Sequence, residues 1–143
     1  MNNTPFDPEQ VLAAPAIVFP GQSAGHAAAF RNAWDLLSRR APREALELIE
    51  PALAEDPDNH GLRSLQAWAF LMRAQLGRAE EVLRDLVDDD PSDTWARHAL
   101  GRALERQSRY DDALPHLRLA AVMSGDVEHE LDVLRVERLA GKI

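Results

Sequence analysis

The chain has 143 residues and a formal net charge of −8 at pH 7. This length suits a single domain, and the acidic balance disfavours both nucleic-acid binding, which needs a concentrated basic surface, and docking on an anionic membrane. The sequence holds no cysteine, so disulfides and thiolate zinc sites are excluded. Of the 16 lysine and arginine residues only Lys142 is a lysine, a bias that suggests a GC-rich bacterial genome.

The N-terminal segment, residues 1–25, predicts no targeting signal. Residues 1–10 carry Asp7 and Glu9 and no basic residue, whereas a secretory signal begins with positive charge and continues with an apolar run. The apolar run at residues 11–19 is interrupted by Pro15, and nothing reaches the ~18 apolar residues of a membrane span. The sequence therefore predicts a cytoplasmic protein. Residues 1–25 are expected to form a partly extended N-terminal segment, for which packing on the repeats is one of the open possibilities.

From residue 26 onward the sequence repeats with a period of 34 residues. Three units, about 26–59, 60–93 and 94–127, align with residues of matching size at corresponding places. Small residues recur in two sets: Ala33, Ala67 and Gly101, then Ala45, Ala79 and Ala113. Larger residues recur in two others: Leu36, Phe70 and Leu104, then Ile49, Leu83 and Leu117. Because small residues let two helices approach closely and large ones fill the space between pairs, each unit predicts two packed helices.

The expected helices span residues 25–39, 43–55, 59–75, 77–89, 92–107 and 110–123. Residues 56–58 and 90–93 combine a proline, which cannot continue a helix, with capping residues for the helix that follows. Pro51 falls inside the second helix, where it should kink the helix or cost stability, and Pro115 falls in or just past the first turn of the sixth. Both are expected on outward or curved faces.

Residues 126–143 predict one more amphipathic helix. Leu131, Leu134 and Leu139 stand among alternating charges there, the pattern of a helix with one apolar face. We expect it to cover the exposed end of the last helix pair as a solubilising cap.

Each unit has, in order, a small residue, a large residue, an alanine, a second large residue and, in the first two units, a proline. This order and the 34-residue period resemble the repeat pattern of the tetratricopeptide repeat (TPR) family. Residues 26–125 carry the resemblance. It implies an all-α fold, a right-handed α-solenoid of three helix–turn–helix repeats that ends in a C-terminal capping helix, as in a small bacterial TPR protein. It also implies a non-catalytic protein–protein interaction module, an adaptor, scaffold or chaperone-like protein that binds a peptide or protein segment in a concave groove.

If the resemblance holds, the first helix of each pair lines that groove. Aromatic and arginine residues there are the composition expected of a peptide-binding surface. The predicted protein-binding residues are Phe30, Arg31, Trp34, Trp68, Leu71, Trp95, Arg102 and Arg106. A ligand with apolar or aromatic side chains, and an acidic residue for Arg102 or Arg106, would fit.

Other interpretations stay open. The tryptophans could be packed in the core, or residues 1–22 could lie across the groove as an internal ligand. In the alternative function, the chain is a structural module that forms a homo-oligomer, a homodimer in the simplest case, through the aromatic surface or the C-terminal helix.

No catalytic, cofactor-binding or metal-binding constellation is predicted. The five histidines lack ligand spacing and are expected to be solvated residues at helix starts. Residues 88–90 are three aspartates without the interleaved spacing of a calcium loop. Residues 21–25 contain glycine and serine but no lysine follows, so they predict no phosphate site. An enzyme is therefore not expected, and the predicted partner is another protein or peptide.

Overall fold

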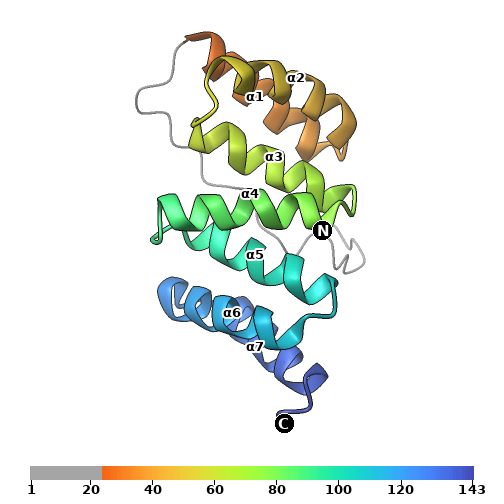
Figure 1. The fold of residues 1–143 in the computed structure, drawn as a ribbon, viewed down its shortest axis with the longest axis vertical. Coiled ribbons are helices and arrows are strands. Elements are labelled where there is room, and N and C mark those ends of the chain that lie inside the picture. The colour runs from red at the N-terminus through yellow and green to blue at the C-terminus, as the bar shows by residue number, and fades with distance from the viewer. Residues whose placement is uncertain (1–23) are drawn as a thin grey trace, which may run out of the picture.

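A computed structural model describes residues 24–143 of the chain, which form seven α-helices and no strand. The helices are α1 (Ala24–Ser38), α2 (Pro42–Glu55), α3 (His60–Met72), α4 (Leu76–Asp89), α5 (Thr94–Arg106), α6 (Tyr110–Ser124) and α7 (Val127–Leu139). Figure 1 shows them stacked in chain order along the long axis, with α1 and α2 at one end and α7 at the other. The all-α class and the helical hairpins are confirmed, while the predictions for residues 1–22 lie outside the described residues.

Each helix packs mainly on its neighbours in sequence, α1 on α2, α3 on α4 and α5 on α6. Contacts of α2 with α3, and of α4 with α5, join one hairpin to the next, and α1 also touches α3. A continuous apolar core runs through the stack and reaches Val136 on α7. The first helices of the first two hairpins, α1 and α3, therefore lie against each other.

Side-chain caps begin α3 and α5. Asn59 Oδ1 accepts a hydrogen bond from the Leu62 N–H, and Asp93 Oδ1 accepts one from the Ala96 N–H, each at 3.0 Å. These side chains satisfy backbone donors that have no partner within the first turn of a helix. Asp93 lies in the predicted capping stretch 90–93 and is confirmed. At the first junction the cap is Asn59, one residue after the predicted stretch 56–58.

The turns within the hairpins have a feature that the sequence analysis missed. Arg40, Ala74 and Ser108, which are 34 residues apart in turn, have φ of 62°, 54° and 60°. The next N–H in each turn reaches back to a carbonyl near the helix end, as from Gln75 to Phe70 at 2.9 Å. This is the left-handed ending in which glycine is usual. Here the positions lack glycine, so no sequence signal marked them, and α3 ends at Met72 rather than at the predicted residue 75.

The small residues allow close packing, as predicted. Ala33 and Ala67 are fully buried. At Gly101 the helices are closer still, since a Cβ added there would lie 2.7 Å from Leu117 Cγ. Pro51 and Pro115 both lie exposed inside continuous helices, α2 and α6.

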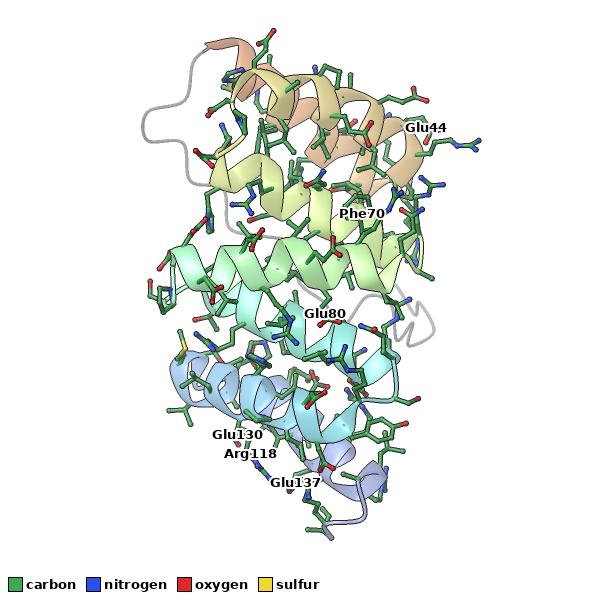
Figure 2. All side chains as sticks on the ribbon, in the orientation of Figure 1. Glu44, Phe70, Glu80, Arg118, Glu130 and Glu137 are labelled. Atoms are coloured by element: carbon green, nitrogen blue, oxygen red, sulfur yellow. The ribbon has the colours of Figure 1, made fainter. Side chains whose placement is uncertain are left out.

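Polar contacts also tie consecutive hairpins together. Glu80 on α4, labelled in Figure 2, accepts hydrogen bonds through Oε1 from Arg109 Nη1 at 2.7 Å and from Gln107 Nε2 at 3.1 Å. Its other oxygen accepts one from Arg84 Nε at 2.9 Å. Burial disfavours the charged carboxylate, but these donors outweigh burial and lower the pKa of Glu80. The second hairpin is thereby fixed to the turn of the third.

Candidate protein-interaction surface

Three of the predicted aromatic residues meet where α1 lies beside α3. The Trp34 ring stacks on Phe30 with 6.3 Å between centroids, and it meets Trp68 edge-on at 5.6 Å. Phe30 is 1% exposed and Trp68 8%, so both belong to the core, whereas Trp34 is only partly buried. Of this cluster, the Trp34 indole is the side chain with accessible surface to offer a ligand.

Leu71 and Trp95 do not join this cluster in the same way. Leu71 is a core residue, 4% exposed. Trp95 is the second residue of α5 and packs, partly buried, against the core. In the 34-residue register the place of Trp34 and Trp68 is taken on α5 by Arg102, two helical turns beyond Trp95. The repeat therefore brings two tryptophans together and places the third elsewhere along its helix.

The three predicted arginines have different surroundings. Arg31 is exposed on α1, and within residues 24–143 it has no ion-pair partner. Arg102 Nη1 is 2.6 Å from Glu105 Oε2, so an internal carboxylate already balances its charge. Arg106 Nη1 donates to the Leu71 carbonyl at 2.9 Å and so links α5 to the end of α3. Of these three arginines, Arg31 is thus the one with the greatest freedom to meet an acidic ligand.

A buried polar network that the sequence analysis did not predict joins α5 to α7. His98 Nε2 donates to Asp132 Oδ2 at 2.7 Å, and each side chain is 3% exposed. Arg135 donates both to Asp132 and to Glu105, with 2.9 Å between its Nε and Glu105 Oε1. Burial opposes ionisation of Asp132, but the hydrogen bonds from His98 and Arg135 prevail and lower the pKa of its carboxyl group. The network anchors the last helix of the stack.

The histidines also differ from the solvated residues expected. His26 Nε2 lies 3.3 Å from Glu55 Oε2, and His60 Nε2 lies 2.7 Å from Asp93 Oδ2. Together with His98, these contacts mean that the first helix of each repeat carries a histidine that contacts a carboxylate further along the chain. A signal was present in the sequence, because His98 and Asp132 are separated by one 34-residue period. The alignment of the repeats matches residues of similar size, and it did not reveal this pair because a histidine and an aspartate are not alike.

His129 on α7 extends this network. Its ring stacks on His98 with 4.0 Å between centroids, and its Nδ1 is 2.8 Å from Ser124 Oγ. The serine–histidine contact does not form a catalytic triad, because Asp132 is hydrogen-bonded to His98, a different imidazole. Ser124 Oγ also accepts the Asp126 N–H at 3.1 Å, so it acts in the turn from α6 to α7.

The protein is expected to lose stability as the pH falls below about 6.5. Burial and the nearby His98 lower the pKa of His129, and burial with the charges of Arg97 and Arg84 lowers that of His116. Unfolded histidines titrate near 6.5, so below that pH the unfolded chain binds more protons and the free energy of unfolding decreases. The lowered pKa of Asp132 adds a further loss only in more acidic solution, below about 4.

Urea denaturation at pH 7.5 and at pH 5.5 measures this effect as a lower midpoint at the acidic pH. His129→Gln and His116→Gln should each reduce the difference between the two midpoints, and the double variant should reduce it most. Equal midpoints for the original protein at both pH values would contradict the expectation.

Comparison with known proteins places the fold. A family model described as tetratricopeptide repeat matches residues 36–94. MamA (AMB-1) is 19% identical over 84% of this chain and 74% of its own, with a TM-score of 0.70. The first TPR domain of human RPAP3 is 16% identical over 82% of this chain and 95% of its own, with a TM-score of 0.75. The Arabidopsis OM64 TPR domain is 18% identical over 78% and 93%, with a TM-score of 0.73.

Residues 36–94 thus match the tetratricopeptide repeat, and the described residues have the fold of TPR domains. The structural likenesses, all at low identity, concern the fold, while the family match extends from the end of α1 to the start of α5. Stacked helical pairs of this kind form extended binding surfaces in repeat proteins.

Two observations bear on other functions. Within residues 24–143 no three histidine or acidic side chains are placed to hold a metal ion. None of the helices in that part of the chain is long and apolar enough to cross a bilayer.

Proposed function

We propose that this chain is a non-catalytic adaptor or scaffold that holds a peptide or protein segment against the face formed by α1, α3 and α5. The observation that carries the proposal is the Trp34 indole, partly exposed and supported by Phe30 and Trp68 from two consecutive repeats. An aromatic side chain fixed in this way presents a large apolar surface and loses little conformational freedom on binding. Such residues often dominate the binding energy of an interface.

The charges of this surface restrict which residue types the ligand is expected to carry. Arg31 lies one helical turn before Trp34 on α1, because the two are three residues apart, and it is exposed. Arg102, in contrast, is paired with Glu105. We therefore expect a ligand with an aromatic or branched apolar residue for Trp34 and an acidic residue for Arg31.

Intrinsic fluorescence tests this proposal, because the chain has three tryptophans. Synthetic peptides that pair an aromatic with an acidic residue are titrated against the full chain, and the tightest is used with variants. Trp34→Ala and Arg31→Glu should each raise the dissociation constant of that peptide by about tenfold or more. Trp34→Ala is the sharper variant, because Trp68→Ala would empty a core position and lower stability by about 3–5 kcal/mol.

A matched control is Leu119→Ala, an exposed apolar residue on α6 that is 43% accessible. It should leave peptide affinity unchanged. If Trp34→Ala and Arg31→Glu bound the peptide as well as Leu119→Ala does, the binding face would have been wrongly assigned.

Self-association is a second candidate function, and it draws on a different surface. The largest exposed apolar side chains of the described residues gather on the last two helices, α6 and α7, and near the C-terminus rather than on the first helices.

A further inference from the structure

The outer face of α7 carries an apolar stripe that none of the described residues covers. Val127, Leu131 and Leu134 are 63%, 51% and 51% exposed. Their spacing of four and three residues puts them on one side of the helix. The opposite side, with Val136 and Asp132, is the buried one. The leucines that define this amphipathic helix in the sequence therefore point away from the core, whereas a terminal cap needs a polar outer face.

The 34-residue register indicates which kind of secondary-structure element would cover this stripe. Leu134 corresponds to Leu100 on α5, one 34-residue period earlier. Leu100 is 1% exposed on a helix that packs against both α4 and α6. The same face of α7 has no helix against it within residues 24–143, so a helix is the element that fits.

Two charged residues beside the stripe indicate what kind of helix would bind there. Glu130 and Arg138 stand four residues before and after Leu134, so all three lie on one face, with the charges about 6 Å either side of the leucine along the axis. Neither charge forms an ion pair with any described residue. Three other charged residues of α7 are paired inside the chain: Asp132, Arg135 and Glu137. Figure 2 shows Glu130 and Glu137 at the end of the stack formed by α6 and α7.

We propose that α7 binds α7 of a second copy of this chain, antiparallel and about a two-fold axis at Leu134. This geometry sets Glu130 opposite Arg138 of the other copy, twice, with the two Leu134 side chains between them. A parallel pair would instead oppose like charges. The inference deepens the second candidate function, self-association, and does not depend on peptide binding by Trp34.

The expected dimer is weak. One helix face is smaller than the roughly 800 Å² per partner of a standard interface, so we expect a dissociation constant in the micromolar range. Sedimentation velocity of the full chain over a concentration series should show a monomer of 15.9 kDa in exchange with a species of twice that mass.

Charge reversal tests the geometry. Glu130→Arg alone and Arg138→Glu alone should each weaken the dimer about tenfold or more, because each opposes like charges twice. The double variant Glu130→Arg/Arg138→Glu should recover it. Mixing the two single variants should also recover it, because every charge then meets its opposite across the axis. Leu134→Asp should abolish the dimer, and circular dichroism checks that these exposed substitutions leave the fold intact.

The outcomes separate the inference from the function on which it rests. A chain that stays at 15.9 kDa at every concentration would overturn both self-association and α7 pairing. A dimer whose dissociation constant is unchanged by Glu130→Arg, by Arg138→Glu and by Leu134→Asp would keep self-association and overturn pairing through α7. A dimer that is lost in both single variants and not regained on mixing would overturn the antiparallel arrangement.

Discussion

Replacing Asp132 with alanine is expected to lower the free energy of unfolding by about 3–5 kcal/mol. The substitution leaves the His98 N–H without its acceptor at a site where both side chains are 3% exposed. It also removes one of the two carboxylates that Arg135 contacts. A buried group that loses its hydrogen-bond partner keeps the full penalty of desolvation. Urea denaturation followed by circular dichroism measures the change.

Asp112→Ala is the matched control for this prediction. Asp112 is an exposed carboxylate on α6 that pairs with Arg109 at 3.1 Å, and exposed pairs contribute little. Its loss should change stability by no more than about 0.5 kcal/mol. Asp132→Asn, which retains an acceptor but not the charge, should fall between the two. Similar values for Asp132→Ala and Asp112→Ala would show that the buried pair does not anchor α7.

The helices were predictable because their signals are local. A proline stop followed by Asn59 or Asp93 marks a helix start whatever the rest of the chain does, and the 34-residue period fixes which residues are small or large. The left-handed turns at Arg40, Ala74 and Ser108 were not predictable in this way. An ordinary L-residue adopts that conformation only when the helices on either side hold it there, and no residue type announces it.

The candidate surface was only partly predictable. The period correctly brought Trp34 and Trp68 together, because matched places on consecutive first helices lie side by side. It could not give their exposure, which depends on how far each helix is rotated within its pair. The same limit applies to α7, where an amphipathic pattern identified a helix but not which side faces the core. Asp132, a charged residue, lies on the buried side because His98 and Arg135 meet it there.

The close approach of α5 and α6 gives the second large effect. Gly101→Ala is expected to lower the free energy of unfolding by about 2 kcal/mol, although alanine favours a helix over glycine by about 1 kcal/mol. The added Cβ would lie 2.6 Å from Leu117 Cδ2 and 3.3 Å from the Leu117 backbone nitrogen. A side-chain rotation alone does not relieve the second contact, so the helices must separate and the core between them loosens.

Gly77→Ala makes the same chemical change where nothing lies within 4 Å of the added Cβ. It should raise stability by up to about 1 kcal/mol, so the two variants are expected to shift the urea midpoint in opposite directions. Leu117→Ala alone should cost about 2–5 kcal/mol by opening a cavity. Combined with Gly101→Ala, it should cost less than the sum of the two, because the new methyl group then enters vacated space. If Gly101→Ala stabilised the protein as Gly77→Ala does, the third helix pair would not depend on the absence of a side chain at residue 101.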